Sequence, residues 1–192
     1  MARAQHGFNL IEVMVSLTVL GILVSLGAPS FAEWLQSQRI RASAEAIVNG
    51  LQVARGEAIR RNLPVVLGLE PYYTGWTVCE ATLPVTPCDS TTPAGSFIQS
   101  KSAQEGSGNA KIAQTPGDVT TLTFSPLGAV LLKNLDGTLP VTQIDVYYDD
   151  RAQCSAAGGT RRCLRVLVSA AGSIRMCDPT PTIVAPDPRA CP

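Results

Sequence analysis

Residues 7–13 read Gly7-Phe8-Asn9-Leu10-Ile11-Glu12-Val13, and they open an apolar stretch that continues to Phe31. Between Phe8 and Phe31 the only charged side chain is that of Glu12. At a rise of about 1.5 Å per residue, a helix over this stretch has a length of about 35 Å, which is enough to cross a bilayer. The stretch is therefore predicted to be a membrane helix.

The residues that flank this helix predict its orientation. Arg3 precedes it, and the next positive charges after it are Arg39 and Arg41. A positive flank immediately before a membrane segment favours a cytoplasmic N-terminus and an exported C-terminal part. Phe31 and Trp34 are then expected at the outer interface, where aromatic rings are favoured.

Three interpretations of the segment compete. A cleaved secretory signal is the first, because Ser30-Phe31-Ala32 offers small residues at a suitable spacing before Glu33. An uncleaved signal anchor is the second. Both leave Glu12 without a role, although an ionisable group at membrane depth costs about 2.5–3.5 kcal/mol on insertion scales. The third interpretation gives this carboxylate a partner.

The stretch Gly7–Val13 resembles the signature of type IV prepilins and of type II secretion pseudopilins. The resemblance implies that a prepilin peptidase cuts between Gly7 and Phe8 and methylates the new amino terminus. Glu12 becomes the fifth mature residue, and its carboxylate pairs with the amino terminus of a neighbouring subunit, so that neither charge is buried alone. Pro29 becomes the twenty-second mature residue, where these pilins carry a helix-loosening proline.

The helix is predicted to continue beyond the apolar stretch to about Arg61. Apolar residues recur there at spacings of four and three residues, which gives one stripe with polar residues opposite. The stripe consists of Ile40, Ala44, Ile47, Leu51, Ala54 and Ala58. A continuous helix from Phe8 to Arg61 has a length of about 80 Å. Its stripe requires cover, for which a β-sheet from the rest of the chain is the obvious candidate.

After Asn62-Leu63-Pro64 the hydrophobic period changes from 3.6 to 2, which predicts strands. The predicted strands are Val65–Leu69, Thr74–Cys79, Val119–Phe124, Ala129–Leu132, Thr142–Tyr148 and Arg162–Ser169. The polar segments Glu80–Gly95 and Ser100–Gly117 are predicted to be surface loops. No crossover helices separate the strands, so the sheet is expected to be mostly antiparallel. The predicted fold class is α+β, with about six to eight short strands packed on the long helix.

The six cysteines all follow the apolar stretch, at positions 79, 88, 154, 163, 177 and 191. No Cys-x-x-Cys pair is present, and an even count in an exported chain predicts disulfides rather than a metal site. Six cysteines allow fifteen pairings, and the sequence alone does not choose among them. The closest-spaced set joins Cys79 to Cys88, Cys154 to Cys163 and Cys177 to Cys191.

The sequence lacks the residues that catalysis and metal binding usually need. The only histidine is His6, before the apolar stretch, so the exported part has neither the commonest general base nor the commonest metal ligand. Neither a Gly-x-Ser-x-Gly motif nor a Gly-rich phosphate loop is present. Asp145, Asp149 and Asp150 are predicted to be solvated turn residues rather than a cation site. No enzymatic activity, metal or cofactor is expected.

Three later segments narrow the resemblance to the GspH/FimT family. They are the helix-to-strand junction Leu51–Leu67, the stretch Phe124–Gly128 and the closing stretch Arg162–Pro179. The family implies a pilin-like fold and a low-abundance subunit. One expectation is a minor pilin of the FimT or FimU kind, which primes or caps a type IV pilus in twitching motility, adhesion and DNA uptake. The alternative is the minor pseudopilin of type II secretion. The stretch Arg175–Pro179 resembles the pilus proteins more.

These expectations divide the chain into four parts. Residues 1–7 are a cleaved leader, 8–31 the membrane half of the helix, 32–61 its amphipathic half and 62–192 the exported β-rich domain. The expected location is the inner membrane, with a single pass and a periplasmic C-terminal domain, followed by incorporation into a pilus or pseudopilus. The expected partners are the prepilin peptidase and other minor and major pilins or pseudopilins.

Five arginines and no acidic residue lie between Arg151 and Cys177, and the arginines are Arg151, Arg161, Arg162, Arg165 and Arg175. A local basic patch in a neutral chain is the usual footprint of phosphate contact, which predicts weak DNA binding. DNA-binding FimT proteins carry Gly-Arg-x-Arg near the C-terminus, whereas Gly172-Ser173-Ile174-Arg175 keeps only the second arginine. A solvated basic face, or a surface that docks a neighbouring pilin, is the alternative interpretation.

Overall fold

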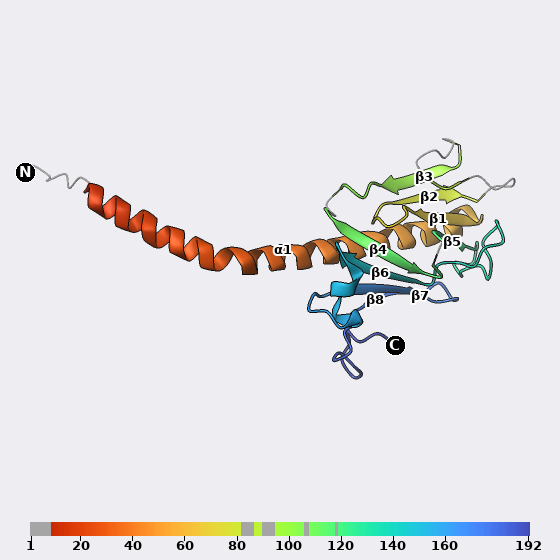
Figure 1. Ribbon diagram of the computed structural model, residues 1–192. Coiled ribbons are helices and arrows are strands. Elements are labelled where there is room, and N and C mark those ends of the chain that lie inside the picture. The colour runs from red at the N-terminus through yellow and green to blue at the C-terminus, as the bar shows by residue number, and fades with distance from the viewer. Residues whose placement is uncertain (1–8, 82–86, 90–94, 106–107, 118) are drawn as a thin grey trace, which may run out of the picture. The chain divides into compact units, whose positions relative to one another are not determined.

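The computed structural model describes residues 9–81, 87–89, 95–105, 108–117 and 119–192, and of residues 26–29 it describes the backbone alone. These ranges form one long helix, eight strands and two short 3-10 helices (Figure 1). Their bounds are α1 Leu10–Arg61, β1 Val65–Leu69, β2 Trp76–Glu80, β3 Phe97–Lys101, β4 Ala110–Thr115, β5 Thr121–Phe124, β6 Gln143–Tyr148, η1 Arg151–Gln153, η2 Ser155–Ala157, β7 Leu164–Val168 and β8 Ile174–Cys177. The chain divides into two compact units, Met1–Gln36 and Ser37–Pro192.

The second half of α1 forms the centre of the larger unit. All six residues of the predicted stripe, from Ile40 to Ala58, are at most 4% exposed, which confirms the stripe. The helix ends at Arg61 because Asn62 adopts the left-handed conformation, with φ at 54°, and Pro64 cannot continue a helix. The predicted C-terminal boundary of the helix is therefore confirmed as well.

The strands form two four-stranded sheets rather than the single sheet expected. Their orders are β3-β2-β1-β5 and β4-β6-β7-β8, and every strand pairing is antiparallel, as predicted. The stripe of α1 belongs to one hydrophobic core with residues from both sheets, among them Trp76 and Phe124 from the first and Ile144 and Val166 from the second. The fold is thus a pilin-like α+β fold, in which a long helix packs on antiparallel sheets.

The strand predictions succeed where the apolar alternation is strong and fail where it is weak. β1 has its predicted bounds, but β4 and the end of β3 lie inside the predicted loop Ser100–Gly117. In β4 only Ala110 and Ile112 are buried, and β3 is an edge strand without a buried large side chain. Both strands therefore lack a clear hydrophobic pattern. The predicted strand Ala129–Leu132 is wrong, because only an isolated bridge joins Val130 to Phe124.

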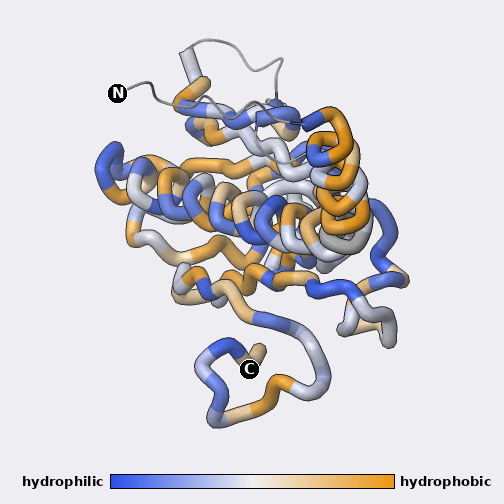
Figure 2. The backbone as a smooth tube through the Cα atoms, turned by 90° about the vertical axis from the view of Figure 1, so that its left-hand side faces the viewer, coloured by the Kyte–Doolittle hydropathy of each residue, from blue (hydrophilic) through white to orange (hydrophobic). Residues whose placement is uncertain are grey.

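Three disulfides tie down the loops of the larger unit. They join Cys79 to Cys88, Cys154 to Cys163 and Cys177 to Cys191, which is the closest-spaced set. The last of them closes the C-terminal tail into a loop beyond β8, which Figure 2 shows as a separate turn of mixed hydropathy below the sheets. In the chain-entropy picture each closure contributes about 2–3 kcal/mol to the free energy of unfolding.

Gly50 faces the ring of Trp76, where α1 packs closely on the first sheet. A Cβ atom at this position would lie 2.7 Å from two ring atoms of the buried Trp76. Although alanine favours a helix over glycine, we expect Gly50→Ala to lower the free energy of unfolding by about 1–3 kcal/mol, because the indole is too confined to move aside. Chemical denaturation measures the change.

Gly56 in the same helix is the matched control. A Cβ atom there has no neighbour within 4 Å, so Gly56→Ala is expected to raise the free energy of unfolding by about 0.5–1 kcal/mol. Equal effects of the two substitutions would show that contact with Trp76 does not decide the outcome at Gly50.

Candidate functional site

The first half of α1 exposes apolar side chains on all its faces. In the unit Met1–Gln36, eleven large hydrophobic residues between Leu10 and Val24 are 44–76% exposed. The hydroxyl groups of Ser16, Thr18 and Ser25 donate to helix carbonyls 2.7–2.8 Å away, so these residues add little polarity to the surface. A helix that is hydrophobic all round belongs in a membrane or in the core of an assembly.

Glu12 is the exception on this apolar surface. It lies in the first turn of α1, and its side chain is exposed. A carboxylate near a helix N-terminus is favoured by the helix dipole, but at membrane depth it still requires a counter-charge. Gly7 and Phe8, the predicted cleavage residues, lie outside the described residues, as does the side chain of Pro29.

The described residues include no single helix that is both long and apolar enough to cross a membrane. The consecutive segments Leu10–Ser25 and Ser30–Arg61 meet the requirement only as a bent pair, by length and composition. Beyond the apolar stretch, the exposed rings of Phe31 and Trp34 stack with their centroids 5.7 Å apart. Paired aromatic rings of this kind suit the boundary between an apolar and an aqueous phase.

Asp145 binds two of the five clustered arginines. It lies within β6 and is 6% exposed, which corrects its prediction as a solvated turn residue. The sheet register places Asp145 opposite Arg165, whose guanidinium donates to the carboxylate over 2.6 Å and 3.2 Å. Arg151 adds a third hydrogen bond of 3.0 Å. A buried carboxylate with bidentate and further charge-assisted bonds is a strong structural contact.

Two further arginines of the cluster hold the C-terminal tail. Arg162 donates to Asp178 over 2.9 Å, and Asp178 is 3% exposed. Arg175 donates to the backbone carbonyls of Pro188 and Ala190, over 3.4 Å and 3.1 Å. Arg161 forms a parallel backbone bridge with Cys154. The structure therefore places four of the five side chains in contacts within the chain.

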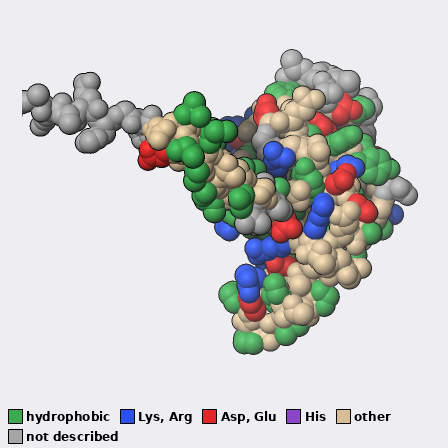
Figure 3. All heavy atoms as spheres, turned by 60° about the vertical axis from the view of Figure 1, so that its left-hand side comes forward, with side chains coloured by type: hydrophobic (Ala, Val, Ile, Leu, Met, Phe, Trp, Pro, Cys, Tyr) green, Lys and Arg blue, Asp and Glu red, His purple; other side chains and the backbone are tan. Residues whose placement is uncertain are grey.

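Two arginines of the cluster share one face of the second sheet, and Asp145 lies on that face with them. Arg165 and Arg175 point to the same face of the second sheet, because Arg165 is opposite Cys177 in the register and Arg175 lies two residues from Cys177. Arg162 precedes β7 and contacts the tail instead. Figure 3 shows acidic side chains beside the basic ones on the face in view. DNA binding by this cluster stays a prediction.

The hairpin between β7 and β8 allows this prediction to be tested. The Ser173 N–H donates to Ser169 Oγ, and the side chain of Ser173 is exposed. We expect weak binding of duplex DNA that falls with added salt, an increase with Ser173→Arg and a decrease with Arg175→Ala, because each phosphate contact releases counterions. Gel-shift titration at low ionic strength measures these changes.

Gln104→Arg, at an exposed position between β3 and β4, adds the same charge elsewhere and is the control for Ser173→Arg. Equal gains in DNA affinity from the two substitutions would show that the total charge of the chain, and not the position of the arginine, sets the binding. The absence of binding in every variant would remove DNA from the partners of this chain.

Two carboxylates of the larger unit, Glu57 near the end of α1 and Asp187 in the C-terminal loop, have lowered pKa values. Hydrogen bonds from Arg60 and Arg61 lower the pKa of Glu57 to about 2, and Arg61 also pairs with Glu80 in β2. Hydrogen bonds from Arg189 lower the pKa of Asp187 to about 2. Folding lowers both pKa values, so the two ionised carboxylates stabilise the folded state. Their contribution to the free energy of unfolding is complete above about pH 4.5 and is lost as the pH falls towards 2.

Within the ranges that the structure describes, no group of three or more histidine, cysteine, aspartate or glutamate residues is placed to hold a metal ion. The conspicuous features are instead an exposed apolar helix with one carboxylate and a disulfide-bonded domain packed on its continuation.

Two family models match these parts. The prokaryotic N-terminal methylation motif matches residues 2–28, and the model described as type II transport protein GspH matches residues 43–172.

The chain belongs to the GspH family.

Two solved structures are similar to this GspH-family protein, and the first of them supports its fold. The minor type IV pilin FimU of Pseudomonas aeruginosa has a TM-score of 0.50 at 15% identity, over 74% of this chain and 91% of that chain. The minor pseudopilin EpsH from the type 2 secretion system of Vibrio cholerae has a TM-score of 0.47 at 15% identity, over 73% of this chain and 98% of that chain. At this identity the likeness to FimU shows the fold alone.

Membership in the family defines the protein in general terms. It is a minor type IV pilin or pseudopilin with an N-terminal methylation motif, and its role is structural rather than enzymatic. The family implies processing by a prepilin peptidase and assembly with other pilins. Among the predicted site residues, the resemblance assigned Glu12 to assembly, and the structure shows it on the apolar helix. Sequence reasoning missed Asp145 and Asp178 as partners of the arginines.

Proposed function

We propose that this protein is a low-abundance subunit of a type IV pilus, which primes or caps the filament. The observation that carries the proposal is the first half of α1, where large apolar residues are exposed all round and Glu12 is the only charge between Leu10 and Val24. Such a surface is stable in a bilayer before assembly and in a bundle of like helices after it. A carboxylate in that bundle requires a cationic partner, which the amino terminus of a neighbouring subunit would supply.

The division of the chain follows from this proposal. Residues 1–7 are removed as a leader, and residues 8–31 hold the protein in the inner membrane until assembly. Residues 32–61 carry the covered stripe, and residues 62–192 form the exported domain, whose disulfides suit an oxidising compartment. The stretch Arg175–Pro179, which resembles pilus minor pilins, leads into the C-terminal loop that Cys177–Cys191 closes.

Type II secretion is the second candidate function, and the description of the matching family model favours it. In that case the subunit belongs to the short pseudopilus that drives export of folded proteins. Both functions use the same helix and the same processing, so the difference lies in which filament the subunit enters.

Deletion of the gene in its native host distinguishes the two functions. We expect loss of surface pili and of twitching, restored by the intact chain, with secretion of folded exoproteins unchanged. An epitope-tagged copy is expected in sheared pili at low stoichiometry. Normal piliation together with retained exoproteins in the periplasm would assign the protein to secretion instead. If neither phenotype appears and the tagged chain enters no filament, the proposal is wrong.

A further inference from the structure

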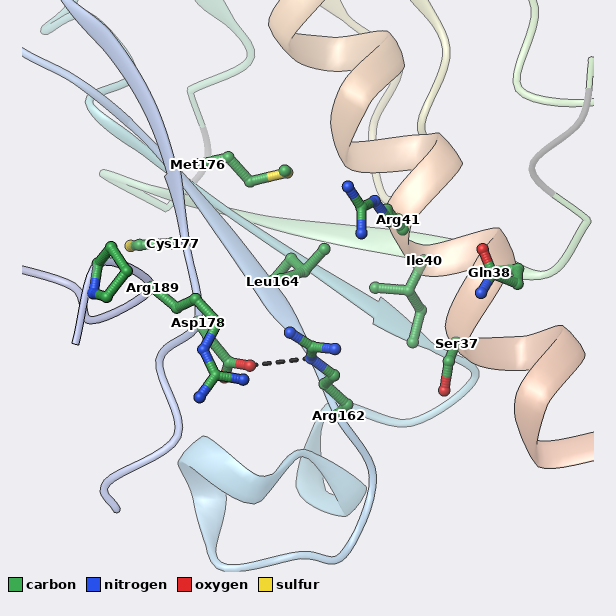
Figure 4. Close-up of a pocket in the computed structure, with 11 residues that line it drawn as sticks. Ser37, Gln38, Ile40, Arg41, Arg162, Leu164, Met176, Cys177, Asp178 and Arg189 are labelled. Carbon is green, nitrogen blue, oxygen red and sulfur yellow. Dashed lines mark hydrogen bonds and ion pairs between the residues drawn. The ribbon is translucent and has the colours of Figure 1, made fainter. Parts of the chain in front are cut away.

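A cavity of about 260 Å³ lies in the larger unit, where α1, β7, β8 and the C-terminal loop meet (Figure 4). Ile40, Leu164 and Met176 give it an apolar wall. Ser37, Gln38 and Arg41 line it from α1, and Arg162 lines it from the segment just before β7. Arg189, on the loop that Cys177–Cys191 closes, completes the lining.

Arginine side chains give this cavity its polar character. Figure 4 shows the guanidinium of Arg41 projecting from the helix towards the strand that carries Leu164, and a dashed line joins the guanidinium of Arg162 to Asp178. The pairs Arg41–Glu45 and Arg162–Asp178 are each made through Nε. Since a guanidinium has five N–H groups, both arginines retain donors that a ligand in the cavity can use.

The acidic partners determine which ligand suits the cavity. Glu45, Asp178 and Asp187 balance the three arginines in formal charge. The pair Arg41–Glu45 is exposed, at 65% and 54%, so Arg41 loses little on turning to another anion. Asp178 is 3% exposed and also accepts from Thr180, so it stays in place beneath Arg162. The cavity thus offers guanidinium donors and small polar groups above an apolar wall.

A glycerophospholipid headgroup matches these groups. Its phosphodiester accepts hydrogen bonds from Arg41 and Arg162, because planar guanidinium groups bind phosphate oxygens well. In phosphatidylglycerol the two free hydroxyls of the headgroup glycerol would face Ser37 and Gln38, and the first methylenes of the acyl chains would contact Ile40 and Leu164. We propose that the cavity binds the headgroup of an anionic phospholipid, phosphatidylglycerol in the first instance. The inference rests on the proposed membrane anchoring.

The position of the cavity residues along the chain supports a lipid as the occupant. Ser37 follows Trp34 by three residues, and the exposed rings of Phe31 and Trp34 end the stretch that the proposed function places in the bilayer. Residues directly after such an aromatic pair reach the headgroup layer. Bound lipid would hold the exported domain at the membrane before assembly, and entry into a filament would release it.

Native mass spectrometry of the full chain in dodecyl maltoside tests the proposal. Dioleoylphosphatidylglycerol and dioleoylphosphatidylcholine are added in separate titrations, and soluble glycerol 3-phosphate is added as a competitor. We expect the anionic lipid to be retained at least about fivefold more than the zwitterionic one, and Arg41→Gln to remove most of this preference. Arg60→Gln, in the last turn of α1 and outside the cavity lining, is the control and should leave the preference unchanged.

Arg41 is the informative position because its ion pair is exposed, so its substitution leaves folding intact. Arg162→Gln should reduce the lipid preference more than Arg41→Gln does. Because this substitution leaves Asp178 without its cation, a circular dichroism melt of the variant checks that it is still folded. Equal retention of the two lipids, or no effect of Arg41→Gln, would overturn the lipid site. Full competition by glycerol 3-phosphate would also overturn it, in favour of a soluble phosphate ester.

Membrane fractionation of the same variants separates this inference from the proposed function. If the protein retains the anionic and the zwitterionic lipid equally, but the intact chain fractionates with membranes and enters filaments, only the lipid site is wrong. If a crosslink places an acidic residue of a co-expressed pilin between Arg41 and Arg162, the cavity docks a protein, and the lipid assignment is likewise wrong.

Discussion

Asp145→Ala is expected to lower the free energy of unfolding by about 3 kcal/mol, near the lower end of the range of about 3–5 kcal/mol for breaking a buried ion pair. The carboxylate is 6% exposed and accepts hydrogen bonds from Arg165, Arg151 and Gln143. Its removal leaves the Arg165 guanidinium without a counter-charge. The Arg165 side chain keeps a quarter of its surface exposed, so water relieves part of the penalty. Urea denaturation at neutral pH measures the loss.

Two comparisons separate the ion pair from a general loss of packing. Glu45→Ala removes the carboxylate of the exposed pair with Arg41 and should change the free energy of unfolding by no more than about 0.5 kcal/mol. The double substitution Asp145→Ala with Arg165→Ala should cost less than the sum of the two single substitutions, because each single substitution leaves one charge of the pair behind and the double substitution removes both. Additive losses would show that the two side chains act independently, and the structural role given to Asp145 would then be wrong.

The arginine cluster shows why charge along a sequence predicts charge in space poorly. Between Arg151 and Cys177 there is no acidic residue, so this window is basic in sequence. In the fold, the antiparallel register of β6 and β7 brings Asp145 opposite Arg165, and Asp178 lies directly after β8. Both acids are outside the window by a few residues only. Neutralisation therefore depends on strand register, which the sequence pattern left undetermined.

The fold itself followed more directly from the sequence. A helical stripe is a local pattern, because residues three and four apart share a face whatever surrounds them. The six stripe residues are accordingly all buried as predicted. The strand β4 was missed because its small residues Ala110 and Ala113 carry little hydrophobic signal, although Ala110 is buried. The cavity beside Arg41 was beyond sequence reasoning, since its lining combines α1 with three segments near the C-terminus that are far from it in the chain.

Glu12→Ala is expected to leave processing intact and to reduce incorporation into filaments about tenfold or more. This expectation rests on the proposed function. Alanine removes the cost of about 2.5–3.5 kcal/mol that a carboxylate carries at membrane depth, so the unassembled subunit becomes more stable in the bilayer. The same substitution leaves the amino terminus of the neighbouring subunit without its counter-charge in the filament. Both effects shift the equilibrium from the filament to the membrane.

Mass spectrometry and filament shearing together test this expectation. The N-terminal peptide of Glu12→Ala should begin at Phe8 with a methylated amine, as in the unaltered chain, because the cleavage residues are unchanged. The sheared filament fraction should then contain about a tenth of the normal amount or less, while the membrane fraction gains the difference, in line with about 1.4 kcal/mol for each factor of ten. Glu33→Ala removes a carboxylate from the same helix beyond the apolar stretch and should assemble normally. Normal incorporation of Glu12→Ala would mean that this carboxylate lies near the headgroups and pairs with no neighbour. A mature start at Glu33 would instead establish an ordinary secretory signal in place of a pilin leader.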